Sequence, residues 1–175
     1  MKRRRFLSLL ALGSSSLLLG SGKIILKERN INIYKKEFAL ISDIQEFIFP
    51  SNKGYLGAKE FNSIGYIETM TKYNIFKNSE VRYLIFGANS FDFRVRSKYG
   101  KPFSNLSLSQ KDKFFKWYIN QSKRNLKWIE KIKIHTLYAL MSDPIYGGNK
   151  NQVGWKWLNI TPPNPRPKVR MGRWE

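Results

Sequence analysis

The chain has 175 residues, of which 42% are hydrophobic and 15% aromatic, so it can form a packed domain and is not a disordered polymer. It contains 32 Lys and Arg but only 12 Asp and Glu, and the formal net charge of +20 predicts an anionic partner: nucleic acid, an anionic lipid surface or an acidic protein. The absence of cysteine excludes disulfides, thiolate catalysis, cysteine-ligated iron–sulfur clusters and covalently attached c-type haem.

Residues 1–22 have the organisation of an export signal. A basic start precedes an apolar stretch, residues 6–19, that glycine and serine dilute. The order R-R-R-F-L contains the twin-arginine pattern R-R-x-F-L, whose arginine pair is recognised by a dedicated export receptor. A spanning helix needs about 20 predominantly apolar residues, so an export signal is favoured, but without an A-x-A cleavage site both removal and retention as an anchor stay open. The predicted signal residues are Arg3, Arg4, Phe6 and Leu7.

Residues 23–36 mix basic and β-branched side chains and are predicted to be a linker with room for one short strand. Apolar residues then recur at three- and four-residue spacings, which is typical of amphipathic helices. The first predicted helix runs from near Glu37 to Pro50, and the second begins near Ala58. Their predicted inner residues are Phe38, Ile41, Ile44, Ile48, Phe61, Ile64, Ile67 and Met70.

Three further helices are predicted along the rest of the domain. Ser79 is the predicted N-cap of the third helix, which ends at Gly100, and Ser109 with Asp112 predicts a capping box for the fourth, which ends near Gln121. The fifth helix is predicted over 125–142. The predicted inner residues of the third helix are Val81, Leu84, Ala88, Phe91 and Val95.

The fifth helix carries two further predictions. Nearly all residues of its second half are apolar, so its burial is expected to increase toward its C-terminal end. His135, the only histidine, continues a polar stripe with Lys127 and Lys131 and is expected to face solvent. It lacks nearby partners for a metal site or an acid–base pair. No metalloprotease, EF-hand, Walker or G-x-G-x-x-G pattern occurs, so the sequence predicts no enzyme.

The stretch 143–157, DPIYGGNKNQVGWKW, follows this helix and is the least generic part of the chain. Proline ends the helix, glycine and asparagine permit left-handed backbone, and the two tryptophans need a surface and a hydrogen-bond acceptor. These residues are compatible with a structural turn whose aromatic side chains cap the core. They also carry a resemblance, through Asp143, Pro144, Tyr146, Gly147, Gly148, Asn149, Gly154 and Trp155, with Trp157 beside them.

The pattern DPxYGGN followed by GW, with a helix before it, resembles the gluconate 2-dehydrogenase subunit 3 family. The resemblance implies a non-catalytic small subunit of a membrane-associated, flavin-dependent dehydrogenase. It also implies a large flavoprotein subunit and a cytochrome subunit as partners, with FAD and haem held by them and no cofactor in this chain. Trp155, Trp157 and Tyr146 are then expected to anchor the partner, because interface hot spots favour such side chains.

The basic residues and five tryptophans also fit a nucleic-acid-binding protein, but no recognised module is present and the export signal argues against this role. Twin-arginine export carries folded cargo, so the protein is expected in the periplasm, associated with the cytoplasmic membrane through its complex. The alternative is a stand-alone exported basic helical protein that binds anionic lipid or cell-wall polymer.

The sequence therefore predicts a mainly α protein, with a small domain of about five helices and an irregular, tryptophan-containing C-terminal segment. The predicted organisation is a signal segment at 1–22, a linker at 23–36, a helical domain at 37–158 and an extended Pro/Arg-rich tail at 159–175.

Overall fold

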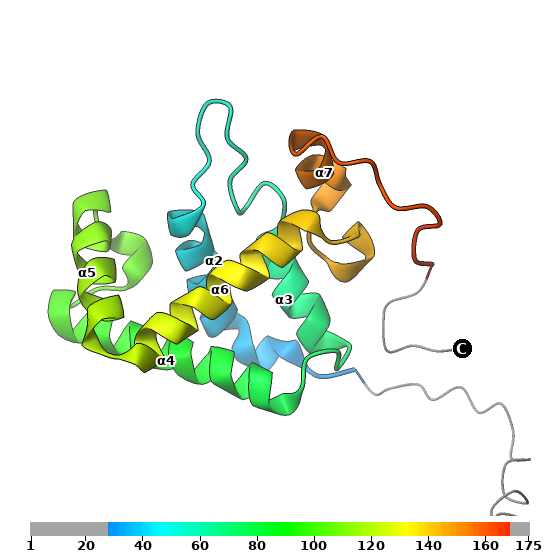
Figure 1. Cartoon of the computed structure of the whole chain (residues 1–175). Coiled ribbons are helices and arrows are strands. Elements are labelled where there is room, and N and C mark those ends of the chain that lie inside the picture. Colours follow the sequence, from blue (N-terminus) through cyan, green and yellow to red (C-terminus); the bar gives the residue numbers. More distant parts are fainter. Residues whose placement is uncertain (1–27, 169–175) are drawn as a thin grey trace, which may run out of the picture.

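A computed structural model describes residues 28–168, which form α-helices joined by turns (Figure 1). The helices are α2 (Lys35–Ile48), α3 (Ser63–Lys72), α4 (Asn78–Tyr99), α5 (Leu108–Gln121), α6 (Lys123–Met141) and α7 (Val153–Trp157). Short 3-10 turns are η1 (Ile31–Tyr34), η2 (Phe103–Asn105), η3 (Pro144–Tyr146) and η4 (Lys150–Gln152). The described residues contain no β-strand, only one isolated bridge, so the predicted mainly α class is confirmed. The predicted signal segment lies outside the described residues.

Helix α6 is the central element of the fold. It packs against α2, α3, α4, α5 and α7, and Figure 1 shows it crossing the molecule from α5 to α7. Its inner face presents Trp128, Ile132, Thr136 and Ala139, which are buried and separated by three or four residues. This spacing keeps the four side chains on one side of the helix, so α6 can contribute to the core along its whole length.

An aromatic cluster closes the core where α4, α5 and α6 meet. The ring of Phe91, which is fully buried, lies 4.8–5.7 Å from the rings of Phe103, Phe114, Tyr118 and Trp128. Aromatic pairs at such distances add about 0.5–1.5 kcal/mol each beyond the burial of their area. The indole N–H of Trp128 donates to the Leu84 carbonyl at 3.2 Å, so this ring is also fixed to the backbone of α4.

A buried polar bridge joins α2, α3 and α6. The side-chain amide of Gln45 donates to the Thr136 hydroxyl at 3.0 Å and accepts from the Ser63 hydroxyl at 2.9 Å. The Thr136 hydroxyl in turn donates to the carbonyl of Ile132 at 2.8 Å. Because each of these buried groups has a partner, the bridge avoids the cost of an unsatisfied polar atom and fixes the relative position of three helices.

Several predicted helices are confirmed, with different ends. The predicted inner residues of the third helix are all buried, and Gly100 caps it with φ +69°. The second helix begins at Ser63 rather than near Ala58, because the intervening residues form turns that end at Asn62 with φ +57°. Of the predicted linker, residues 28–36 contain η1 and the start of α2 and no strand.

The predicted N-terminal caps were wrong. Ser79 lies inside α4, whose N-cap is Lys77. The capping box of α5 uses Ser107 and Gln110, two residues before the predicted pair: the Ser107 hydroxyl accepts from the Gln110 amide at 3.2 Å, and the Gln110 side chain accepts from the Ser107 amide at 3.0 Å. Glutamine satisfies the same box as an acidic residue, so two overlapping patterns were available and the earlier one forms.

The predicted burial gradient of α6 and the predicted exposure of His135 were also wrong. Trp128 and Ile129 are buried in the first half of α6, whereas Tyr138 and Met141 near its end are 51% and 48% exposed. The second half has apolar residues on both sides of the helix, and only one side can face the core. His135 is 4% exposed and belongs to the buried side.

None of the helices between residues 28 and 168 combines the length and the hydropathy needed to span a bilayer.

Candidate functional site

The segment after α6 turns sharply back onto the helix. Ser142 leaves the helical conformation with ψ 159°, and the Asp143 carboxylate accepts a hydrogen bond from the Ile145 amide at 3.0 Å. Pro144 opens η3, as expected for a residue with no amide hydrogen to satisfy. The chain therefore reverses within four residues of the last turn of α6.

Three glycines of the predicted motif lie against helix backbones. Gly147 has φ +89°, and a Cβ added there would collide with the Gly65 carbonyl of α3. Gly148 and Gly154 lie in the same way against the C-terminal end of α6, where a Cβ would fall inside van der Waals distance of backbone atoms. Only glycine allows this approach, so the spacing of the motif reflects the packing of a turn between α3 and α6.

Asn149 is the central hydrogen-bonding residue of this turn. It is fully buried and adopts a left-handed conformation with φ +45°. Its side-chain amide donates to the Ser142 carbonyl at 3.0 Å, and its side-chain oxygen accepts from the Gly154 amide at 2.8 Å. One side chain thus joins the end of α6 to the start of α7.

The two tryptophans of the motif have different environments. Trp155 is 3% exposed, and its indole N–H donates to the Met141 carbonyl at 2.7 Å. It therefore caps the core, and its ring is not available for the direct partner contact expected from the sequence. Trp157 is 47% exposed and donates to the Gly54 carbonyl at 3.3 Å, and Tyr146 is half-buried, so these two side chains can reach a partner.

Part of the predicted tail is fixed to the same turn. Arg166 donates to both carboxylate oxygens of Asp143, from Nε at 2.8 Å and from Nη2 at 3.0 Å, and lies over the ring of Trp155. This hydrogen-bonded pair lowers the pKa of Asp143, against the effect of burial and together with the Ile145 amide. The described tail carries no helix after α7, but it is anchored at Arg166.

Helix α3 packs against α6 (Figure 1), and an apolar groove of about 350 Å³ opens beside this turn, between α3 and the C-terminal half of α6. We call it the C-terminal groove. It is lined by Tyr66, Met70, Tyr138, Met141, Ser142, Asp143 and Tyr146. Burial, together with the neighbouring Tyr138 and Tyr146, raises the pKa of Tyr66, so its phenol is neutral near pH 7. The single carboxylate of the groove is paired with Arg166, so the groove offers apolar and phenolic surface rather than acid–base groups.

His135 lies behind this groove and has a structural environment. Its Nε2 is 2.8 Å from the Glu80 carboxylate, and Lys131 is 3.2 Å from the same oxygen. Burial lowers the pKa of His135, and Glu80 only partly opposes this. Burial also raises the pKa of Glu80, but the hydrogen bonds from His135 and Lys131 lower it on balance. A neutral His135 therefore donates to ionised Glu80 and links α6 to α4.

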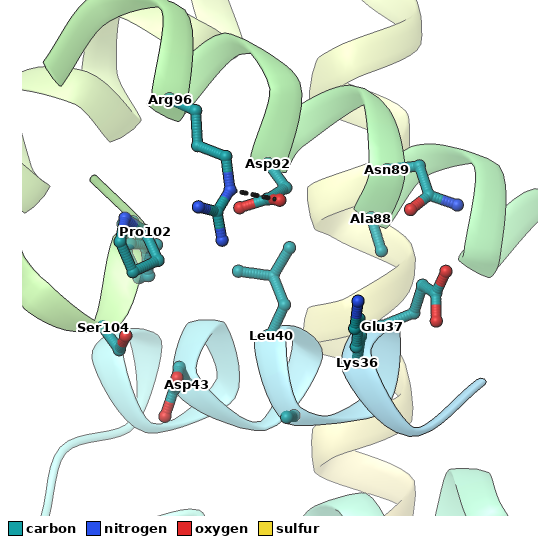
Figure 2. Close-up of a pocket in the computed structure, with 12 residues that line it drawn as sticks. Lys36, Glu37, Leu40, Asp43, Ala88, Asn89, Asp92, Arg96, Pro102 and Ser104 are labelled. Carbon is teal, nitrogen blue, oxygen red and sulfur yellow. Dashed lines mark hydrogen bonds and ion pairs between the residues drawn. The ribbon is translucent and has the colours of Figure 1, made fainter. Parts of the chain in front are cut away.

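A second cavity, of about 360 Å³, lies between α2 and α4 (Figure 2). Figure 2 shows Arg96 paired with Asp92, with Lys36, Glu37 and Asp43 spread along α2. The charges are of both signs and do not converge on one point, so the cavity has no evident chemistry. Within residues 28–168, no group of three or more His, Asp or Glu side chains could hold a metal ion.

The groove was not predicted from the sequence, because the helical residues that line it fit the apolar patterns of two predicted helices. One signal was available: the second half of α6 has apolar residues on its outer face as well as on its inner one, which predicts a second covered surface. Tyr138 and Met141 are the residues on that outer face.

These features define a small helical protein whose signature motif builds a turn beside an apolar groove. The family described as gluconate 2-dehydrogenase subunit 3 matches residues 35–162, and the chain belongs to that family. No curated protein and no solved structure matches the chain.

Replacing Asn149 by alanine should destabilise the protein by roughly 2–4 kcal/mol, because the Ser142 carbonyl and the Gly154 amide would lose their partner inside the core. Chemical denaturation followed by circular dichroism measures this change. The matched control is Asn151→Ala, at an exposed left-handed residue of the same turn. Equal losses in the two variants would show that the left-handed backbone, rather than the hydrogen bonds, carries the effect.

Replacing Arg166 by glutamine should lower stability near pH 7 but not in strong acid. The folded-state pKa of Asp143 lies below its ordinary value, so the contribution of the pair is fully present above that value and is lost as pH falls through the folded-state pKa. Unfolding curves of both chains over a pH series test this. Arg96→Gln, which breaks the exposed Asp92 pair, should have little effect. A difference that persists in strong acid would contradict the assignment to Asp143.

Proposed function

We propose that this protein is a non-catalytic small subunit of a flavin-dependent, gluconate-type dehydrogenase complex, and that the C-terminal groove docks its large subunit. The observation that carries the proposal is the exposed apolar end of α6 in a member of this family. Tyr138 and Met141 are each about half exposed, yet they lie beside a formed groove rather than scattered over the surface.

The composition of the groove suits a protein interface. Tyrosine and methionine are enriched at interfaces, and tyrosine is a frequent hot-spot residue. Tyr138 and Tyr146 can supply area and a hydroxyl each, while Met141 can adapt to the shape of the partner. We infer that the groove receives an apolar side chain from an acidic surface of the large subunit, since the chain has 32 basic and only 12 acidic residues.

The second part of the proposal concerns export. The Arg3-Arg4 pair would direct the small subunit to the twin-arginine machinery, and the docked flavoprotein would cross with it after folding around FAD. FAD would then be held by the large subunit and haem by a cytochrome subunit. The complex would operate at the periplasmic side of the cytoplasmic membrane.

The first experiment is an affinity pull-down of the tagged full-length chain from gently solubilised membranes, with an absorbance spectrum of the eluate. A large co-eluting polypeptide with flavin absorbance supports the proposal. A lone colourless band at low salt overturns it and favours the stand-alone exported protein.

Replacing Met141 by aspartate should abolish this co-elution without unfolding the subunit. Docking would bury the new carboxylate without a partner, and a hot-spot position costs about 2 kcal/mol or more, a loss of at least thirtyfold in affinity. The matched control is Leu108→Asp on α5, which puts the same charge at another exposed apolar residue. Loss of co-elution in both variants would contradict docking at the groove.

Replacing Arg3 and Arg4 together by lysine should leave both the small and the large subunit in the cytoplasm, because the receptor reads the arginine pair rather than the charge. Fractionation with immunodetection of both subunits measures this. Export of the large subunit in the presence of the double variant would refute the carrier role, while docking itself would still be judged by the Met141 variant.

A further inference from the structure

A third cavity, of about 260 Å³, lies at the other end of α6, between its first turn and α4. The α4 residues that line it include Tyr83, Ser90 and Arg94, and the start of α6 contributes its N-cap Ser122 and Arg124. Among the described residues that line this cavity, none is acidic. It is therefore a cationic cavity, and we call it the arginine cavity.

The two arginines of this cavity differ from the neighbouring Arg96 in their partners. In the part of the chain that the structure describes, neither Arg94 nor Arg124 forms an ion pair, whereas Arg96, two residues away, is paired with Asp92 at 2.7 Å. Arg124 instead lies over the ring of Phe86, 4.5 Å from its centroid. An unpaired guanidinium presents a planar fork of donors that suits phosphate and carboxylate oxygens.

Neutral groups complete a polar wall. The Ser122 hydroxyl oxygen accepts from the Asn125 amide at 3.1 Å, which leaves its hydrogen free to donate into the cavity. Burial raises the pKa of Tyr118, which also lines the cavity, to about 12, and the positive charges of Arg94 and Arg124 oppose this rise. Burial raises the pKa of Tyr83, which also lines the cavity, and the negative charges of Glu80 and Glu130 add to this rise.

One exposed aromatic side chain lines the cavity, and a second lies on the same side of α4. Phe86 is 56% exposed and lines it, and Phe93 is 72% exposed and lies seven residues further along α4, hence on the same side of the helix. Exposed aromatic rings would not contribute to the binding of a free phosphate ion. They would contribute to the binding of a lipid headgroup, because its phosphate lies next to an interfacial region in which aromatic side chains are stable.

We propose that the arginine cavity binds the phosphate of an anionic phospholipid headgroup, with Phe86 and Phe93 entering the lipid interface beside it. The charges are complementary: two guanidiniums and a hydroxyl would donate to the phosphate, and none of the described residues that line the cavity is a carboxylate that competes for them. The site goes beyond the proposed subunit docking and does not depend on it.

The position of the cavity is compatible with docking at the groove. The arginine cavity lies at the first turn of α6 and the C-terminal groove at its last turn, and a helix of 19 residues is about 28 Å long. A subunit held on a bilayer by the first site would therefore keep the second free for the large subunit.

The test is co-sedimentation of the full-length chain with vesicles of phosphatidylcholine alone or mixed with phosphatidylglycerol. The signal segment is the same in every variant, so its contribution cancels. Arg94→Gln with Arg124→Gln should lower the phosphatidylglycerol-dependent binding about tenfold or more. Phe93→Ala, at a side chain too exposed to be needed for folding, should lower binding to the same vesicles.

The matched control is Lys35→Gln with Lys36→Gln, which removes two exposed charges from α2, and it should bind the mixed vesicles like the unaltered chain. Equal losses in both double variants, or none in the arginine variant, would overturn the proposal. Calorimetric binding of inorganic phosphate without any preference for phosphatidylglycerol would also overturn it in favour of a free-phosphate site. A pull-down with the arginine variant should still recover the large subunit, which separates this site from docking.

Discussion

The two hydrogen bonds of the Asn149 side chain hold the C-terminal end of α6 in its observed form, and the candidate site is arranged around them. Asn149 is buried in a left-handed conformation, which asparagine tolerates better than most residues, and it bonds both the Ser142 carbonyl and the Gly154 amide. Its position brings α7 to α6, so that Trp155 can reach the Met141 carbonyl. The same turn places Tyr146 at the edge of the groove.

The family motif consequently separates into two groups of residues with different roles. Gly147, Gly148, Asn149, Gly154 and Trp155 are explained by close packing and internal hydrogen bonds. Asp143 and Tyr146 are the motif residues that line the groove, and Asp143 is also paired with Arg166. The motif therefore identifies the fold of the family, whereas partner choice would depend on residues outside it, Tyr138 and Met141 among them.

Much of the fold could be predicted from the sequence because periodicity and chain breakers are local signals. The five residues of the α4 stripe are all buried, and Gly100 ends that helix as a left-handed residue. His135 could not be placed in the same way. It continues a polar stripe in sequence, but its Nε2 meets Glu80, 55 residues away, and a histidine of lowered pKa can be buried without a charge. Long-range pairing of this kind leaves no periodic trace.

The groove and the arginine cavity escaped prediction for a related reason, since each is formed by two helices far apart in sequence. Met70 of α3 and Tyr138 of α6 line the groove, and Arg94 of α4 and Arg124 of α6 line the arginine cavity. A shared helix also explains how a small domain could serve two surfaces. The outer side of α6 is basic near its start and apolar near its end, so one rigid element would present cationic surface at one end and apolar surface at the other. The basic residues near the start of α6 would then act at a bilayer. Docking of the large subunit at the other end of the helix would depend mainly on Tyr138, Met141 and Tyr146.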